Sequence, residues 1–211
     1  MTASSDPRTL ALHSLRLKGF ADAAAVSASL GLPEAEATAL LEQFVADELA
    51  TKREGRLSGY TLTPAGRAEH LALLTAELEA TGAQPAIHDA YTRFLKINGD
   101  LLGICTAWQL REVDGESIIN DHSDPAHDAA VIEQLADLHA NVSPICDDLG
   151  AALPRFANYR ERLGSALAKV QAGEVDWFTK PMIPSYHTVW FELHEDLLAT
   201  LGIDRASEGQ H

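Results

Sequence analysis

The spacing of apolar residues changes near Leu49, and this change limits the folds open to the first 80 residues. Before it, apolar residues recur every three to four positions in three short stretches, the third of which covers residues 34–49. After it come two short extended segments, residues 49–53 and 59–63, joined by a charged segment that contains glycine. A further helical stretch begins at Thr63-Pro64. The predicted order is three helices, a two-stranded hairpin and a fourth helix.

A cluster of helix-breaking residues divides the chain. Thr81-Gly82-Ala83-Gln84-Pro85 separates two helical stretches and holds both glycine and proline. We therefore predict one domain over residues 1–80 and a second over residues 85–205. The length of 211 residues fits two small domains, and the hydrophobic share of 46% is enough for each to bury a core.

The first domain resembles a known family at one passage. Tyr60-Thr61-Leu62-Thr63-Pro64-Ala65-Gly66-Arg67 resembles the step from the wing strand into the next helix of MarR-type winged helix-turn-helix regulators. Gly31-Leu32-Pro33 and Asp47-Glu48-Leu49 resemble the two ends of their third helix. The resemblance covers roughly residues 8–80. It implies a third helix in the major groove of double-stranded operator DNA, a wing on the DNA backbone, and a homodimer.

The resemblance implies a set of DNA-contacting residues on the third helix, the wing and the start of the fourth helix. They are Thr38, Gln43, Lys52, Arg53, Arg56, Ser58 and Arg67.

The charge of the chain restricts how it can bind DNA. The 16 basic and 31 acidic side chains give −15, which disfavours wholesale electrostatic binding to nucleic acid or to anionic membranes. Residues 1–80 hold seven basic and eleven acidic side chains, so most of the excess lies beyond residue 80. The exposed face expected for the third helix is nevertheless acidic. A protein-interaction or accessory module that does not bind DNA is therefore the alternative function.

From residue 85 onward no period-two alternation is visible, and we expect an all-α helical bundle, so that the whole chain is mainly α. Asn98-Gly99-Asp100 is expected to break the first long helix, and residues 112–124 to form a polar loop. Ser143-Pro144 either kinks a helix or begins a new one. Gly99 and Gly103 leave one face of the first long helix without side chains. A ligand or a partner helix could approach closely there, and ordinary tight helix packing is the alternative.

Aromatic and histidine side chains gather in the second domain, most densely near its end. A mostly apolar pocket with a few polar groups is typical of small-molecule sites. The sequence predicts an effector site, with an aromatic core as the alternative. Its residues would be Trp108, Trp177, Tyr186, His187, Trp190 and His194.

Signatures of catalysis or of a bound metal are weak. Residues 120–128 hold two histidines and three aspartates, but their spacing matches no closed structural metal site, and a solvated acidic loop is the main expectation. A small metal-binding protein or enzyme using His187 and His194 is a third hypothesis. The chain has no phosphate-binding loop and no dinucleotide fingerprint. We expect no catalytic residue, no metal and no cofactor.

The two cysteines, Cys105 and Cys146, form no Cys-x-x-Cys pair, which predicts buried, reduced thiols. No signal peptide and no apolar run long enough for a membrane helix is visible. The sequence therefore predicts a cytoplasmic transcriptional regulator that senses a small molecule through its helical domain.

Overall fold

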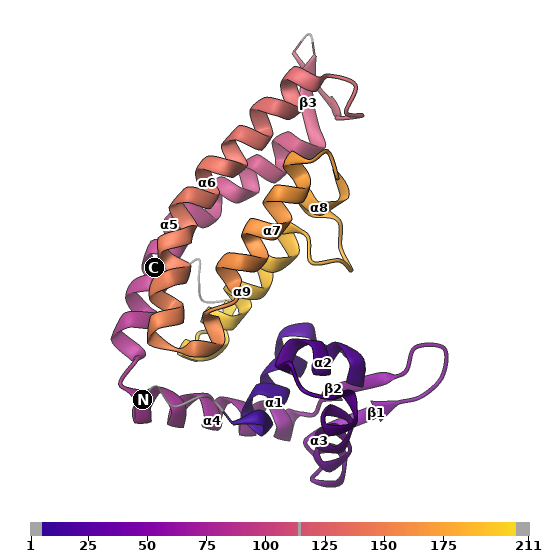
Figure 1. Cartoon of the computed structure of the whole chain (residues 1–211), viewed down its shortest axis with the longest axis vertical. Helices are drawn as coiled ribbons and strands as arrows, with labels where there is room; N and C mark the ends of the chain where they lie inside the picture. Colours follow the sequence, from indigo (N-terminus) through magenta and orange to yellow (C-terminus); the bar gives the residue numbers. More distant parts are fainter. Residues whose placement is uncertain (1–5, 114, 206–211) are drawn as a thin grey trace. The chain divides into compact units, whose positions relative to one another are not determined.

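The computed structural model describes residues 6–113 and 115–205, and it is mainly helical, as predicted. Its contacts divide the chain into two units (Figure 1). Of the described residues, 6–84 and 195–205 form the first unit, and Pro85–His194 forms the second.

The first unit has the order of elements that the apolar spacing predicts. Two of its helices begin at a capping residue followed by proline: the side chain of Asp6 accepts hydrogen bonds from the backbone N–H of Arg8 and Thr9, and that of Thr63 from the N–H of Gly66. The elements are α1 (Pro7–Lys18), α2 (Ala23–Leu30), α3 (Glu34–Ala46), β1 (Ala50–Arg53), β2 (Gly59–Leu62) and α4 (Pro64–Thr81).

The hairpin of β1 and β2 is antiparallel, with Ala50 opposite Leu62 and Arg53 opposite Gly59. It is held to the rest of the unit by backbone hydrogen bonds and by core packing. Tyr60 exchanges two backbone hydrogen bonds with Ala21, and buried side chains of the hairpin join the core of the unit. That core consists of Ala11, Leu12, Leu15, Ala21, Val26, Ala37, Leu41, Phe44, Ala50, Tyr60 and Leu62.

Gly66 allows a close backbone approach in the first unit. A Cβ atom placed on it would lie 1.9 Å from the carbonyl oxygen of Leu49, where no side chain fits. The first turn of α4 therefore lies directly against the chain between α3 and β1. The φ of Gly66 is not in the left-handed region, so the backbone conformation does not require glycine here. Glycine is required by the close packing against Leu49.

The second unit is built on long helices (Figure 1). Its elements are α5 (Gln84–Gln109), whose first residue belongs to the first unit, β3 (Leu110–Val113), β4 (Glu116–Ile119), α6 (Pro125–Ala152), the short 3₁₀ helix η1 (Pro154–Phe156), α7 (Tyr159–Gln171), α8 (Asp176–Thr179) and the start of α9 (Tyr186–Leu201).

The expectation of an all-α second domain is wrong at one place. β3 and β4 form an antiparallel hairpin in which Val113 pairs with Glu116, inside the stretch predicted as a polar loop. The two residues between them are Asp114 and Gly115, and Gly115 has φ +83, which glycine adopts at low cost. Neither strand has a buried side chain, so no apolar alternation marks them in the sequence.

Two helices run through residues that the sequence marks as breakers. α5 continues across Asn98-Gly99-Asp100, and α6 continues across Pro144. Proline removes one backbone donor inside α6, and the hydroxyl of Ser143 donates to the carbonyl of His139 at 2.7 Å. No new helix begins at Ser143-Pro144, because α6 runs through both residues without a break.

The second domain predicted over residues 85–205 extends too far. α9 begins in the second unit, but its residues from Glu195 onward group with the first. Buried Asp196 hydrogen-bonds to His13, and Glu195 forms ion pairs with Arg16 and Arg205. The contacts of Asp196 with His13 and of Glu195 with Arg16 join residues that are far apart in the sequence, so the local pattern could not reveal them.

Candidate functional site

The candidate DNA interface lies in the first unit, on α3 and the hairpin. On α3, the hydroxyl of Thr38 donates to the carbonyl of Glu34 at 2.8 Å, within its own helix. The side-chain amide of Gln43 donates to Asp47 at 2.8 Å, and Asp47 also forms an ion pair with Arg8 at 3.2 Å. Both predicted α3 contacts are therefore already hydrogen-bonded inside the unit.

Lys52 lies on β1 and is held against α3. Its Nζ lies 2.7 Å from Glu42 Oε1, and the hydroxyl of Tyr60 donates to the same oxygen at 2.7 Å. The hydrogen bonds from Lys52 and Tyr60 lower the pKa of Glu42, and the one to Glu42 raises the pKa of Lys52. The side chains of Lys52 and Glu42 are solvent-exposed, so their ion pair adds little stability. Its main effect is that Lys52 neutralises an acid of α3.

Arg53 and Arg56 lie toward the tip of the hairpin, where both are exposed. Within the described residues neither forms an ion pair. Ser58 closes the turn, since its hydroxyl donates to the carbonyl of Gly55 and accepts from the Gly55 N–H. Arg67 donates from Nη1 to the carbonyl of Leu62 at 2.9 Å and thereby links α4 to the end of β2. Of the predicted contacts, the two tip arginines are the most accessible for phosphate.

The acidity of α3 is unevenly distributed. Glu42, in its second half, is paired with Lys52, and Asp47, the C-cap of the helix, is paired with Arg8. Glu34 and Glu36 lie in its first turn, both exposed, where the partial positive charge of the helix N-terminus favours carboxylates. The acidic face expected from the sequence is thus concentrated at one end of the helix.

A buried polar network in the first unit has no local signal in the sequence. His13 of α1, His70 of α4 and Asp196 of α9 are all buried. His13 Nε2 lies 3.0 Å from Asp196 Oδ1, and His13 Nδ1 lies 2.9 Å from His70 Nε2. The hydroxyl of Thr200 also donates to Asp196 Oδ1, at 3.1 Å. The network joins three helices that are far apart in the chain.

Several predicted effector residues form one aromatic cluster in the second unit. The rings of Trp190 and His194 both pack on the ring of Phe94, with centroid distances of 4.9 Å and 5.3 Å. The indole N–H of Trp190 donates to Asn98 at 2.9 Å. Tyr186 stacks on Trp190 at 6.2 Å, and its buried hydroxyl lies 3.4 Å from His139 Nδ1.

Burial changes the ionisation of groups around this cluster. It raises the pKa of Tyr186 and lowers that of His187, which is half-buried. The pKa of His139 is lowered by burial and by the positive charge of Arg160. Neutral forms are therefore favoured here, as expected for a packed aromatic core.

The other two predicted effector residues lie in different surroundings. Trp108 is buried and stacks on Phe178, with ring centroids 4.3 Å apart, and the ring of His122 also packs on it, at 4.5 Å. Trp177 is half-buried, and Lys169 Nζ lies 3.3 Å from the centre of its ring. A groove of about 440 Å³ in this unit is lined by other residues, from α5 and α6.

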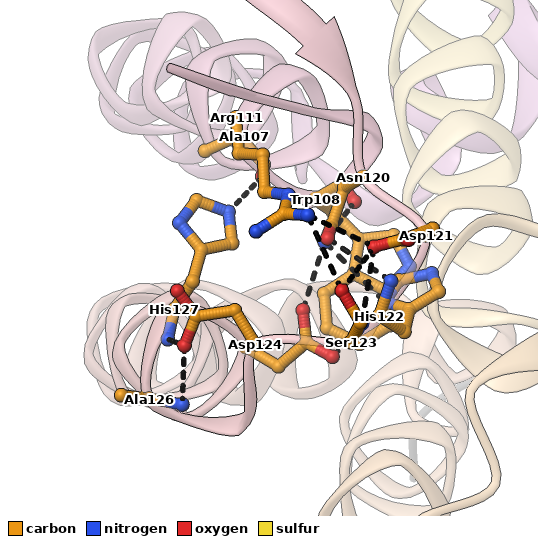
Figure 2. Close-up of polar contacts among 11 residues, drawn as sticks. Ala107, Trp108, Arg111, Asn120, Asp121, His122, Ser123, Asp124, Ala126 and His127 are labelled. Carbon is orange, nitrogen blue, oxygen red and sulfur yellow. Dashed lines mark hydrogen bonds and ion pairs between the residues drawn. The ribbon is translucent and has the colours of Figure 1, made fainter. Parts of the chain in front are cut away.

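The segment between β4 and α6 is an ordered network of hydrogen bonds, shown in Figure 2. The side-chain amide of Asn120 donates to Asp128 at 2.8 Å and to the carbonyl of Trp108 at 3.0 Å. His122, whose φ is +59, has its Nδ1 3.0 Å from the other Asp128 oxygen. Such internal pairing supports a structural role.

The surrounding residues of Figure 2 continue this network. Asp124 caps α6 as predicted, by accepting from the backbone N–H of Ala126 and His127. Arg111 Nη2 donates to Asp121 and Ser123, both at 3.2 Å. Among the residues that the structure describes, no group of three or more His, Cys, Asp or Glu side chains is arranged to hold a metal ion.

Comparison with protein-family models, with curated proteins and with solved structures found no match to this chain. In the described part of the chain, no helix is both long and apolar enough to cross a membrane.

Proposed function

We propose that the first unit is a winged-helix DNA-binding module and that the protein is a transcriptional regulator. The observation that carries the proposal is the combination of α3 with an arginine-tipped hairpin. Arg53 and Arg56 are exposed on the hairpin, while Lys52 and Arg8 neutralise Glu42 of α3 and Asp47 at its C-terminal end. Repulsion of phosphates is thereby reduced on the part of α3 that lies beside the hairpin.

The proposed mode of binding is mainly electrostatic. Arginines at a wing tip contact phosphates and position the module on DNA, whereas exposed polar groups of α3 face the base edges. A small basic contact surface gives modest affinity. Two copies in a dimer would engage two half-sites, which compensates for a weak single module.

The second unit is proposed to dimerise and to bind a small molecule. The effector site follows the sequence-based prediction, and its only structural support is that Tyr186, Trp190 and His194 lie together in one buried cluster of rings. An effector acts by favouring one of two conformations, which requires unequal affinity for them.

A salt titration tests the DNA proposal. Fluorescence anisotropy of a labelled promoter fragment would measure the binding constant at several salt concentrations. Arg53→Ala combined with Arg56→Ala should flatten the slope of log K against log salt by about 2, because two phosphate contacts are lost. Lys180→Ala, an exposed cation of the second unit, is the control. Specific binding that is unaffected by the arginine pair would contradict the proposed interface.

A protein-interaction module is the second candidate, favoured by the exposed carboxylates of Glu34 and Glu36. Glu36→Lys separates the two functions. It should strengthen nonspecific DNA binding if α3 faces DNA, and weaken a contact with a basic protein partner if it does not. Glu36 is a better choice than Glu42, because Glu42 also holds Lys52 and Tyr60.

A further inference from the structure

We propose that an exposed face of α5 is the contact surface for a second copy of this chain. The face consists of Leu95, Gly99, Leu102, Gly103 and Thr106, which recur at helical spacing and are all exposed. The inference rests on the dimer of the proposed function and assigns a surface to it. It does not depend on whether the first unit binds DNA.

The two glycines create an open hollow. Nothing in the protein lies within 4 Å of a Cβ placed on Gly99 or Gly103, and neither has a positive φ. Intramolecular packing and backbone geometry therefore do not require glycine at either position, although each costs about 1 kcal/mol in a helix relative to alanine. With α6 they border the groove of about 440 Å³, whose lining residues are Gly99, Asp100, Gly103, Ile104, Gln134, Asp137, Leu138 and Asn141.

Apolar side chains protrude from the same face that holds the hollow. Leu102 is 60% exposed and Leu95 is 38% exposed. A twofold interface brings one surface patch against itself, so the patch must contain both protrusions and matching hollows. An antiparallel pair of α5 helices meets this requirement, because leucines of one copy lie against the glycine hollow of the other. Without side chains at the glycines, the helix axes approach closely.

The charges around the groove of one copy also complement those of a second copy. Lys96 is exposed beside this face, and Asp100 and Asp137 line the groove. Within residues 6–113 and 115–205, these three side chains form no ion pair. In the antiparallel pair, Lys96 of each copy lies near the acidic edge of the other. A second copy therefore supplies both the leucines and the cations that the groove lacks.

Sedimentation velocity of the full chain over a concentration series tests this interface. We expect the wild type to dimerise, and Gly103→Leu and Lys96→Glu each to raise the dissociation constant at least about tenfold. Lys96→Glu combined with Asp100→Lys should restore dimerisation by exchanging the charges. Ile119→Ser, which changes an exposed apolar residue of β4, should have no effect. Circular dichroism should show an unchanged fold for Gly103→Leu, since its surroundings are open.

Two results would overturn the interface: a wild type that remains monomeric throughout, or a dimer that is unaffected by Gly103→Leu and Lys96→Glu. A monomer that captures a basic peptide in the groove would also contradict a second copy as its occupant. DNA binding measured on the same proteins separates the two proposals. A monomer that binds promoter DNA specifically would support the DNA-binding module and refute the α5 interface. A dimer that binds no promoter DNA would support the α5 interface and refute the DNA-binding module.

Discussion

His13 Nε2 and Asp196 Oδ1 lie 3.0 Å apart in the interior of the first unit, and their side chains are only 7% and 3% exposed. An ionised carboxylate can only accept, so His13 carries a hydrogen on Nε2. His13 Nδ1 lies 2.9 Å from His70 Nε2, so the two rings share one hydrogen bond. The three side chains thus form one hydrogen-bonded chain that links α1, α4 and α9.

Asp196→Ala should destabilise the first unit by about 1–3 kcal/mol, because it removes the buried carboxylate that hydrogen-bonds to His13. Urea denaturation followed by far-UV circular dichroism measures the change. Glu133→Ala, which removes an exposed carboxylate of the second unit outside the groove, should change stability by less than about 0.5 kcal/mol. Equal effects of the two substitutions would show that the buried network contributes little.

Two glycine substitutions should change stability in opposite directions. Gly66→Ala places a Cβ 1.9 Å from the Leu49 carbonyl oxygen and should cost about 1–3 kcal/mol. Gly99→Ala meets nothing within 4 Å and should stabilise α5 by up to about 1 kcal/mol in dilute solution. Amide hydrogen exchange resolves the two units separately. Stabilisation by Gly66→Ala would contradict the close approach of α4 to the chain before β1.

The two thiols should be unreactive in the native protein. Burial raises the pKa of Cys105 to about 11 and is the main reason that the pKa of Cys146 is raised to about 12, so neither forms the nucleophilic thiolate at neutral pH. Reaction with a disulfide reagent at pH 7.5 should therefore be slow without urea and rapid in it. Fast labelling of the native protein would show that the thiols are accessible.

The same shifts predict loss of stability in alkali. A raised pKa means that the folded state binds the proton more tightly than the unfolded state. The contribution to stability is therefore complete below the ordinary thiol value near 9, and is lost as pH rises through about 11 to 12. Between pH 8 and 10.5, alanine at both cysteines should make the free energy of unfolding less dependent on pH. Urea denaturation at several pH values in this interval measures the change.

Acid should destabilise the second unit through half-buried His187. Burial lowers the pKa of His187, so the unfolded chain takes up the proton first as pH falls. The contribution is complete above about 6.5 and is lost as pH decreases through the folded value. His187→Gln should weaken the acid dependence of urea denaturation, followed by tryptophan fluorescence, with wild type and variant compared first at pH 8. An unchanged pH profile would contradict the effect of burial.

The Lys52–Glu42 pair predicts a test of how the wing contacts DNA. Lys52→Ala combined with Glu42→Gln removes both charges of an internal pair, so the slope of log K against log salt should hardly change. Arg53→Ala with Arg56→Ala removes two unpaired charges and should lower that slope by about 2. The two double variants are compared on one promoter fragment by anisotropy. A larger loss from the first would mean that Lys52 leaves Glu42 to bind phosphate.

The fold of the first unit could be predicted well because its signals are local. Asp6-Pro7 and Thr63-Pro64 mark helix starts, and the change of period after residue 49 marks the hairpin. The β3–β4 hairpin was missed because its strands bury no side chain, although Asp114-Gly115 is a strong turn signal. The break expected at Asn98-Gly99-Asp100 is absent, because long-range packing of Phe94 and Leu101 stabilises α5 across it.

The candidate site was only partly predictable. The sequence identified charged residues on the hairpin but could not show that Lys52 is bound to Glu42 while Arg53 and Arg56 remain available. It also grouped six effector residues that the structure divides among different surroundings: Tyr186, Trp190 and His194 share ring contacts, whereas Trp108 stacks on Phe178. Ion pairs and ring contacts depend on which elements meet, and spacing along one element does not contain that information.

The amino-acid sequence by itself determined the order and type of the main elements, the caps of the helices and the surplus of acids. These properties depend on residues that are neighbours along the chain. Only the tertiary structure decided that residues 195–205 belong with the first unit, that His13, His70 and Asp196 meet, and that Gly99 and Gly103 stay uncovered within the described chain. These contacts form between segments that are distant in the sequence. Which side chains become buried or hydrogen-bonded there depends on how the elements pack, and not on the residues next to them in the chain.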